Sequence, residues 1–576
     1  MPHSGEFAGT SEHRRNAPRG EPHSSFDAFP WKSYAWARMR VRVPLGTALL
    51  AVLALGAIGS ARAAEIGGSQ GNDRLIGTQR PDLMLARGGH DYLEGRAGGD
   101  LLDGGTGRDL VFAGAGNDRI ALHADDGRDA VFCGAGQDLV NAELADTVGP
   151  DCEVVVRQLS RDRSAGFPAQ LGTQVEPDSL SAGSTIVTAF QSGRLVDGGA
   201  AVIAWATSRD AGRTWRRGFL EYPGRVSDPV VAYDESRGTW LIAALGAADR
   251  NAALLVARSP DGVAWTPLRS VVDDATETYD KEWLTCDNRR SSRFHGRCYL
   301  AYLDVASSEI RVRRSTDGGA TWSAPARILS GAPPPATPNG AQPVVRPDGT
   351  VLVPFTVFGS IDDATTDRIS VARSMDGGAT FGPARRIAQL FEEVQIDVRA
   401  PAFVSADVDA GGTVYLAWAD CRFSRECTSN GIVLVSSSDG VTWSAPRYVP
   451  VGAPDAPAHR FVPGLALDPA SRGTSARIAI TTYTVSKPQG CVDCEVIDAY
   501  LVTSADGGRS WRPAVRLNVE SMSTHWLAAT SLGPMLGDYI STSYVGGQPV
   551  PVLALAAAPD EVGFREAIYA GTGVPR

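Results

Sequence analysis

Several features that would point to common functions are scarce or missing in this 576-residue sequence. A basic excess is absent: the formal net charge is −10, which argues against a nucleic acid as a partner. Aromatic residues make up only 7%, whereas glycine (63) and proline (36) are abundant, as in a turn-rich β-protein. No second Cys-x-x-Cys accompanies Cys491-x-x-Cys494 and no histidine lies nearby, which argues against zinc. The C-terminus carries nothing that resembles a sorting motif.

One apolar run follows a polar, irregular N-terminal stretch. Residues 43–59 are apolar, follow the basic segment 39–42 and precede Ala61-Arg62-Ala63, the order of a signal peptide with an A-x-A cleavage site. A membrane anchor is the alternative, but the run is short and glycine-rich for one. We therefore expect a signal peptide at 39–63, after a non-native or disordered extension at 1–38. The protein is then secreted or held at the cell surface, without a stable membrane span.

The cysteines also fit export. Their number is even and they fall in near pairs, which predicts local disulfides. The predicted pairs are Cys133–Cys152, Cys286–Cys298, Cys421–Cys427 and Cys491–Cys494.

Between residues 71 and 151, aspartates recur at a spacing of nine residues with one insertion. An apolar residue stands two positions after each aspartate, and glycine-rich turns fill the gaps. A disordered linker rich in glycine and aspartate is the alternative, but it has no reason to keep the apolar residues in phase. The apolar residues are Leu75, Met84, Leu93, Leu102, Val111, Ile120, Val131 and Val140.

This pattern resembles the G-G-x-G-x-D-x-U-x nonapeptide of RTX-type calcium-binding β-rolls. The resemblance implies a parallel β-roll at 64–152, in which the apolar side chains face a narrow core. Carboxylates and loop carbonyls offer Ca²⁺ hard oxygens, and without the ion the aspartates repel, so we expect calcium binding and folding to be coupled. Glycines are missing around 79–87, so we expect some sites to be empty. The candidate ligands are Asp73, Asp82, Asp91, Asp100, Asp109, Asp118 and Asp138.

An eight-residue pattern, Ser-x-Asp-x-Gly-x-Thr-Trp, recurs six times after the roll, with two copies one residue shorter. Each copy stands between two β-rich runs, which predicts a hairpin turn. The aspartate accepts backbone N–H groups, the glycine supplies positive φ and the aromatic ring packs on the sheet. We favour structural turns over six calcium or active sites. The aspartates are Asp210, Asp261, Asp317, Asp376, Asp439 and Asp506.

These turns resemble the Asp-box, or bacterial neuraminidase repeat, of the sialidase superfamily. Four strands accompany each repeat, which is one propeller blade, so the resemblance implies a β-propeller at 153–576. Six blades are one arrangement. Seven blades, in which residues 154–156 supply the last strand of the final blade, are the arrangement we favour. The expected fold class is all-β, a parallel β-roll followed by a six- or seven-bladed β-propeller.

Polar residues stand where the expected innermost strands begin, facing the central funnel. In sialidases three arginines clamp the substrate carboxylate, and a tyrosine activated by a glutamate is the nucleophile. The Phe/Tyr-Arg-Ile-Pro motif of known sialidases is absent here, and charges that pair with each other around a solvated channel are the alternative. The resemblance implies Arg225, Arg399 and Arg460 as substrate ligands, Tyr539 with Glu282 as the nucleophile pair, and Asp228 or Asp280 as the acid.

Three functions stay open at this point. The first is a retaining exo-glycosidase acting on sialic acid or another acidic sugar. The second is a non-catalytic extracellular propeller that binds a glycan or a protein, with the roll as a calcium-dependent spacer. A cation-dependent lyase is the third. The arginines favour a glycan or other anionic ligand for the first two, the missing motif favours binding, and the oligomeric state is unknown from sequence.

Overall fold

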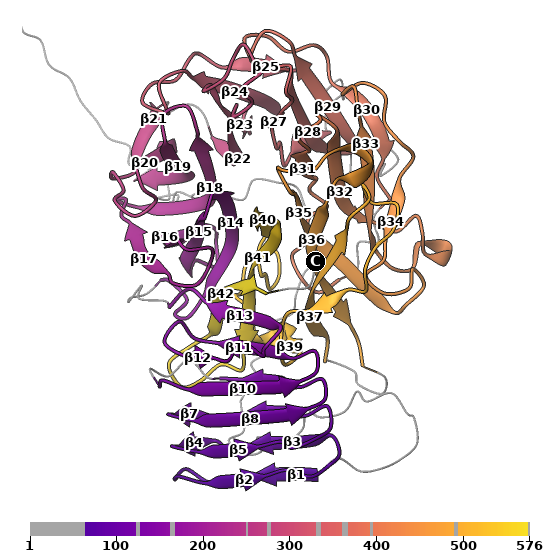
Figure 1. Cartoon of the computed structure of the whole chain (residues 1–576). Coiled ribbons are helices and arrows are strands. Elements are labelled where there is room, and N and C mark those ends of the chain that lie inside the picture. The colour runs from indigo at the N-terminus through magenta and orange to yellow at the C-terminus, as the bar shows by residue number, and fades with distance from the viewer. Residues whose placement is uncertain are drawn as a thin grey trace, which may run out of the picture.

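The computed structural model describes residues 64–122, 127–161, 168–248, 251–273, 278–329, 336–359, 367–391, 396–488 and 494–573. The predicted extension, the signal peptide and Cys491 lie outside these residues. Nearly all regular structure is β, so the expected all-β class is confirmed. Within these residues no helix is long and apolar enough to cross a membrane. Figure 1 shows a stack of short strands at the bottom and larger sheets above it.

The stack is a parallel β-solenoid built from two facing sheets. Its register advances by 18 residues per coil, so two nonapeptides make one coil, and by 20 across the insertion. One sheet contains β1 (Ala64–Gly67), β3 (Asp82–Leu85), β6 (Leu101–Asp103), β9 (Arg119–Ala121) and β11 (Leu139–Ala142). The other contains β2 (Arg74–Ile76), β5 (Tyr92–Glu94), β8 (Leu110–Ala115), β10 (Ala130–Ala135) and β12 (Thr147–Val148), and β4 (Gly88–Gly89) pairs with β7 (Thr106–Gly107).

The solenoid core consists of apolar side chains from the two facing sheets. All eight apolar residues that the repeat phase predicts as inward are buried in one cluster, which confirms that phase. Successive coils therefore stack like on like, and each aliphatic side chain is removed from water by its counterparts above and below. The Cys133–Cys152 disulfide joins the last two coils.

The other strands form antiparallel units of four, each strand pairing with its neighbour in sequence. Six units carry the Ser-x-Asp turn between their third and fourth strands, as expected. The first units are β14 (Gln174–Ala182), β15 (Thr185–Arg194), β16 (Ala200–Ser208), β17 (Arg216–Leu220); β18 (Arg225–Asp234), β19 (Thr239–Ala248), β20 (Asn251–Ser259), β21 (Arg269–Asp273); β22 (Tyr279–Cys286), β23 (Cys298–Asp304), β24 (Glu309–Ser315), β25 (Ala326–Ile328).

The next units follow the same plan. They are β26 (Thr337–Asn339) with β27 (Val344–Val345), β28 (Val351–Phe358), β29 (Arg368–Ser374), β30 (Arg385–Gln389); β31 (Ser405–Val408), β32 (Val414–Asp420), β33 (Gly431–Ser437), β34 (Arg447–Val449); β35 (Ala458–Leu467), β36 (Ile478–Ser486), β37 (Val496–Ser504), β38 (Val515–Arg516). The short β39 (Met522–Ser523) lies beside β37. Short 3₁₀ turns occur at Arg425–Cys427, Gly473–Ser475 and Thr524–Trp526.

The last unit takes a strand from the solenoid. It consists of β40 (Ser541–Val545), β41 (Gln548–Ala557), β42 (Arg565–Thr572) and β13 (Val154–Gln158). Val155 pairs with Thr572 in antiparallel register and with Val140 of β11 in parallel register. One nine-stranded sheet therefore runs without a break from the first coil of the solenoid into this unit. The sequence analysis placed 154–156 beside the C-terminal hairpin, and the structure has that pairing.

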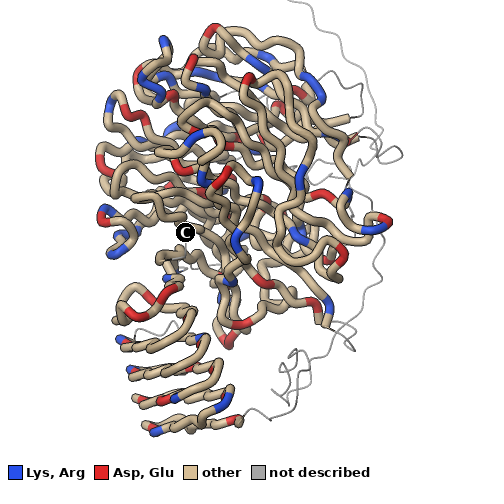
Figure 2. Tube along the Cα trace, turned by 45° about the vertical axis from the view of Figure 1, so that its right-hand side comes forward, with Lys and Arg blue, Asp and Glu red and all other residues tan. Residues whose placement is uncertain are grey.

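The innermost strands close a ring. Contacts pass from β14 to β18, β22, β27, β31, β35 and β40, and from β40 back to β14. Side chains at the starts of these strands, which come from distant parts of the chain, therefore meet around one axis. Figure 2 shows charged residues of both signs across the sheets and along the edges of the solenoid.

Three of the predicted disulfides are present. They join Cys133 to Cys152, Cys286 to Cys298 and Cys421 to Cys427. Cys494 is also disulfide-bonded, and its predicted partner lies outside the described residues.

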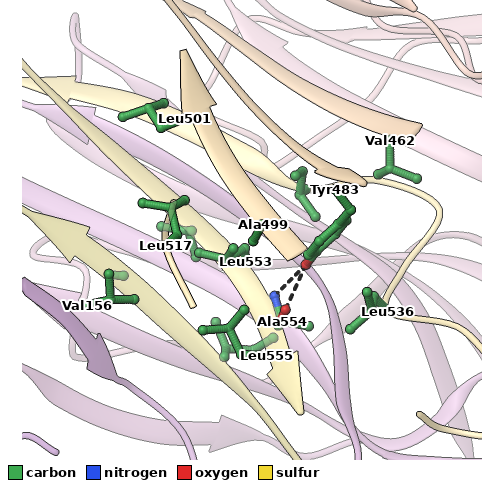
Figure 3. Packing of buried hydrophobic residues seen from close by; sticks show 14 of the residues in the cluster. Val156, Val462, Tyr483, Ala499, Leu501, Leu517, Leu536, Leu553, Ala554 and Leu555 are labelled. Carbon is green, nitrogen blue, oxygen red and sulfur yellow. Dashed lines mark hydrogen bonds between the residues drawn. The ribbon is translucent and has the colours of Figure 1, made fainter. Parts of the chain in front are cut away.

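A buried tyrosine links two neighbouring units near the solenoid. The Tyr483 hydroxyl on β36 donates to the Ala554 carbonyl oxygen of β41 at 2.8 Å and accepts the Ala554 N–H at 2.9 Å (Figure 3). The tyrosine is fully buried, and it packs in the largest apolar cluster of the chain. Its hydroxyl thus satisfies both polar groups of one backbone position that water cannot reach.

We predict that Tyr483→Phe lowers the free energy of unfolding by about 1–3 kcal/mol, because it leaves the buried Ala554 amide without its partner. Urea denaturation measures this loss. Tyr448→Phe is the matched control: its hydroxyl donates to Gly452 at an exposed site, so the expected loss is under about 1 kcal/mol. Equal losses in both variants would contradict the role given to Tyr483.

Candidate functional site

The solenoid aspartates form two ladders along the stacked coils. In each ladder the Oδ1 atom of one aspartate accepts the backbone N–H of the aspartate one coil before. The Asp73 N–H donates to Asp91 at 2.6 Å, and the Asp82 N–H donates to Asp100 at 2.9 Å. Further rungs are Asp91 to Asp109 (2.8 Å), Asp100 to Asp118 (2.8 Å), Asp109 to Asp129 (2.7 Å), Asp118 to Asp138 (2.8 Å) and Asp129 to Asp146 (3.1 Å).

The second carboxylate oxygen distinguishes two groups of aspartates. In Asp73 and Asp82 it accepts an N–H from Ser69 at 2.5 Å and from Thr78 at 2.6 Å, respectively. In four others it is buried, with no hydrogen-bond partner among the described residues; these are Asp91, Asp100, Asp118 and Asp138. A buried, unsatisfied carboxylate oxygen is costly and calls for a cation.

The surroundings of these oxygens fit Ca²⁺. A Cβ atom on Gly95 would lie 2.6 Å from Asp100 Oδ2 and 2.4 Å from the Ala113 carbonyl oxygen, so glycine lets a carboxylate and a carbonyl converge. Loop carbonyls such as that of Ala113 would complete the oxygen shell around such carboxylates. Burial, with repulsion from other aspartates, raises the pKa of Asp100 and of Asp118 to about 6.

A second cluster of charges lies where the innermost strands meet. On four of these strands a β-bulge holds a non-glycine residue at positive φ: Glu176 (54°), Asp228 (49°), Lys281 (44°) and Val462 (51°). Such a conformation costs on the order of 1–3 kcal/mol and is typical of functional sites. Bulges also redirect side chains, and three of these four residues are charged and buried.

Arg399 is a cationic residue of this cluster and is paired with Asp538. Its Nε donates to Asp538 Oδ1 at 2.8 Å and its Nη2 to Asp538 Oδ2 at 2.5 Å, while its buried Nη1 has no hydrogen-bond partner in the described residues. Arg399 also interacts electrostatically with Glu176 and Asp228. One arginine thus lies among more carboxylates than it can neutralise.

The acids of the cluster are poised to hold protons. Burial, followed by repulsion from Asp228 and Asp538, raises the pKa of Glu176, which accepts hydrogen bonds from Gln191 and from the Asp538 N–H. Burial also raises the pKa of Asp228. Such carboxyl groups are protonated nearer to neutral pH than free ones and can act as acids there.

The strand β22 contributes three consecutive charged residues. Asp280 is partly exposed and accepts a hydrogen bond from Asn339 Nδ2 at 3.0 Å; burial and repulsion from Asp228 raise its pKa to about 6. Glu282 is fully buried, and neither of its oxygens bonds to another described residue. The Lys281 ammonium has no hydrogen-bond acceptor in the described residues and lies 3.4 Å from the ring centroid of Tyr539.

Tyr539 lies inside the cluster but its hydroxyl is engaged. It donates to the Pro229 carbonyl oxygen at 3.0 Å, and its ring meets Trp283 edge-on. Burial, followed by repulsion from Glu176 and Asp228, raises the pKa of Tyr539 well above its usual value. This environment disfavours the phenolate.

The three predicted arginines have separate partners. Arg225 pairs with Asp197 at 2.9 Å, on the loop between β15 and β16. Arg460 is buried and donates to the carbonyl oxygens of Val451, Ala458 and Ala453. Of the predicted residues the structure brings together Arg399, Tyr539, Glu282, Asp228 and Asp280.

Glu176, at the centre of this cluster, escaped the sequence reasoning. Its signal was present in the repeat: an X-Pro pair recurs on the innermost strands, as Glu176-Pro177, Asp228-Pro229 and Val462-Pro463. Aligning β14 with β18 through this pair would have placed Glu176 beside Asp228.

The Ser-x-Asp turns use their carboxylates internally. Asp317 accepts the N–H groups of Ala320 (3.0 Å) and Thr321 (2.9 Å) and the Thr321 hydroxyl. Burial opposes the effect, but the hydrogen bonds from Thr321 and Ser315 prevail and lower the pKa of Asp317 to about 2. These contacts are those of a structural turn.

Comparisons with known proteins support the calcium repeats. Residues 67–102, 94–126 and 103–140 match the model of the RTX calcium-binding nonapeptide repeat (4 copies), so the N-terminal part carries such repeats. No curated protein sequence matches the chain. Similar solved structures include a Penicillium chrysogenum α-L-arabinanase, with 14% identity over 56% of this chain and 92% of that chain and a TM-score of 0.39. A Hadza microbial sialidase has 14% identity over 64% of this chain and 73% of that chain, with a TM-score of 0.35. An ulvan lyase is also similar, with 12% identity over 72% of this chain and 94% of that chain and a TM-score of 0.39.

We predict that calcium removal destabilises the solenoid and, through β13, the ring. Without metal, stability falls as pH rises from about 4 to above 6, because the carboxyl pKa values near 6 exceed the ordinary 3.8 and the native state must then give up its protons. The loss of melting temperature is therefore larger at pH 7.5 than at pH 5. Circular dichroism follows both parts, and tryptophan fluorescence follows the ring, since every described tryptophan lies beyond residue 200.

Asp118→Asn is the informative variant, with magnesium as the ion control. It removes one buried charge, so it raises the melting temperature of the metal-free protein at pH 7.5 and reduces the gain from calcium. Unchanged melting with and without calcium at both pH values would refute the prediction.

Proposed function

We propose that this chain is a secreted, calcium-stabilised exo-glycosidase that acts on sialic acid or another acidic sugar at the cluster around Arg399. The observation that carries the proposal is the convergence of several carboxyl groups with raised pKa values on strained bulges of the innermost strands. Glycoside hydrolysis needs one carboxyl group that gives a proton and a second that stays ionised. Environments that push the two pKa values apart supply this division.

Asp280 is the proposed general acid. Asp280 is less buried than Glu176, Asp228 and Glu282, which favours the approach of a leaving-group oxygen, and its pKa of about 6 keeps it protonated at mildly acidic pH. Asp228 is the proposed second carboxylate, since Lys281 and Arg399 oppose the rise of its pKa that burial and Asp538 cause. Burial raises the pKa of Glu282 well above its usual value, which disfavours the charged form of that residue.

An acidic sugar suits the cations of the cluster. Among the described residues, neither Arg399 Nη1 nor the Lys281 ammonium has a hydrogen-bond acceptor. The ion pair with Asp538 fixes Arg399, and the rings of Tyr539 and Trp283 fix the Lys281 ammonium. A substrate carboxylate would therefore bind to two positive charges that are already in position. In this proposal Arg399 takes the substrate-binding role, whereas Arg225 and Arg460 keep their protein partners.

A non-catalytic glycan- or protein-binding propeller is the second candidate. The observation that favours it is the engaged Tyr539 hydroxyl, together with the dispersed partners of Arg225 and Arg460. These contacts weaken a sialidase-type mechanism with Tyr539 and Glu282 as the nucleophile pair. They do not weaken the carboxyl mechanism above.

The number of propeller blades and the export of the protein are also part of the proposal. We infer seven blades, with β13 as the last strand of the final blade, from the ring of innermost strands and the pairing of β13 with β42. Export is supported by the disulfides and by the calcium repeats, because both are stable in an oxidising, calcium-rich exterior.

We predict that Asp280→Asn lowers kcat on a fluorogenic sialoside or glucuronide at least about 10²-fold, because it removes the proton donor. In the unaltered protein kcat/KM falls as pH rises through about 6, since Asp280 must be protonated, and this limb is lost in the variant. Hydrolysis is followed by fluorescence in calcium-containing buffer.

Asp560→Asn, on an exposed loop, is the matched control and keeps full activity. Tyr539→Phe separates the mechanisms: the carboxyl mechanism expects a change below about 10-fold, whereas a tyrosine nucleophile expects abolished turnover. Turnover of neither substrate by the folded, calcium-loaded protein would overturn the enzyme and favour the binding propeller.

A further inference from the structure

A pocket of about 470 Å³ opens between two neighbouring Ser-x-Asp turns, away from the central cluster. One turn joins β24 to β25 and the other joins β29 to β30. Figure 2 shows basic residues at the upper end of the molecule, where Figure 1 places β24 and β25. The lining residues are Arg297, Arg314, Thr316, Thr321, Trp322, Ser323 and Asp376.

The arginines of the pocket have no carboxylate partner in the described part of the chain. Arg297 donates to the Gly377 carbonyl oxygen at 2.7 Å, and the Arg314 guanidinium makes no hydrogen bond or ion pair to a described residue. Arg346, like Arg297, donates to carbonyl oxygens of the next turn. The junction of the first two turns differs, because Arg209 of one turn pairs with Asp261 of the next at 2.5 Å.

One further polar group at this junction is buried without a hydrogen-bond partner in the described residues. It is the indole N–H of Trp322, which lines the pocket. In two other turns the equivalent indoles, Trp215 and Trp265, donate to a glycine carbonyl of their own turn at 3.0 Å. Trp322 therefore lacks a contact that Trp215 and Trp265 make within their own turns, and buried donors of this kind are normally hydrogen-bonded.

The one carboxylate in the lining is already used. Asp376 accepts the N–H groups of Ala379 (2.9 Å) and Thr380 (3.0 Å) and the hydroxyls of Thr380 (2.7 Å) and Ser374 (2.8 Å). It is thus a poor counter-ion for Arg314. The pocket therefore offers a ligand two arginines and several hydroxyls, beside one carboxylate, Asp376, whose charge its own turn stabilises.

We propose that this pocket is a second saccharide site, which binds one acidic residue of a polyanionic glycan through Arg314 and Arg297. A carboxylate or sulfate accepts paired N–H donors from arginine, and the ring hydroxyls of a sugar exchange hydrogen bonds with Thr316 and Ser323. A volume near 470 Å³ accommodates one to two sugar rings. The site lies on the rim, so a long chain held here would also reach the central cluster, with a gain in effective concentration.

The inference does not depend on hydrolysis at the central cluster. Its test is direct binding, by titration calorimetry, of three probes of similar length: oligogalacturonate, a sulfated chondroitin oligosaccharide and neutral maltohexaose. We expect the acidic probes to bind, the neutral probe to bind at least ten-fold more weakly, and the affinity to fall as salt rises. The two acidic probes show whether carboxylate or sulfate is preferred.

Arg314→Gln is the decisive variant, and Arg385→Gln, an exposed arginine on β30 outside the pocket, is its charge-matched control. Arg314→Gln weakens acidic-probe binding at least ten-fold, Arg314→Lys restores part of it, and Arg385→Gln leaves it unchanged. Asp280→Asn also leaves it unchanged, which separates this site from the proposed active site. Melting temperatures verify that each variant is folded.

Three results would overturn the proposal. They are equal binding of neutral and acidic probes, equal affinities of Arg314→Gln and Arg385→Gln, and no binding of any probe by the unaltered protein. Loss of glycoside hydrolysis with retained rim binding would count against the proposed function alone.

Discussion

The pairing of β13 on both of its edges is the constraint on which the two halves of this molecule depend. Its parallel partner β11 ends the solenoid, and its antiparallel partner β42 belongs to the last unit of the ring. Asn141 and Arg119 reinforce the junction through hydrogen bonds to backbone oxygens at residues 517 and 519. A strand shared in this way cannot be ordered in one half and free in the other, so the charge state of the solenoid aspartates bears on the ring.

The solenoid and the ring differ in how their buried carboxylates are neutralised. The solenoid repeats the same acid on every coil and leaves one oxygen of several carboxylates buried without a partner, which a hard cation can satisfy. The ring instead gathers different acids around Arg399 and Lys281, at bulges that hold Glu176 and Asp228 in a strained backbone conformation. Repetition suits a structural ion, whereas an irregular cluster suits chemistry on an asymmetric substrate.

Much of the fold could be predicted because its signals are local and periodic. The spacing of Leu75 to Val140 identifies the inward face of the solenoid, since like residues must stack on like in a coil of constant length. The turn at Asp317 is equally readable, because its hydrogen bonds all fall within the turn. The candidate site was harder to predict. Arg225, Arg399 and Arg460 were all predicted as substrate ligands from their places at strand starts, and of the three Arg399 lies beside Asp538 and interacts with Asp228. Arg460, at a comparable strand start, donates instead to backbone carbonyl oxygens.

By itself the sequence determined the all-β class, the calcium repeats, the turns and three disulfide pairs, because each depends on residues within about one repeat of each other. Only the tertiary structure decided which charges meet. Glu176 and Asp538 are 362 residues apart and are joined by a hydrogen bond when the ring closes. The rim pocket is likewise a tertiary feature, because the space beside Arg314 arises from how two neighbouring units pack. The local sequence does not specify the separation between these two units.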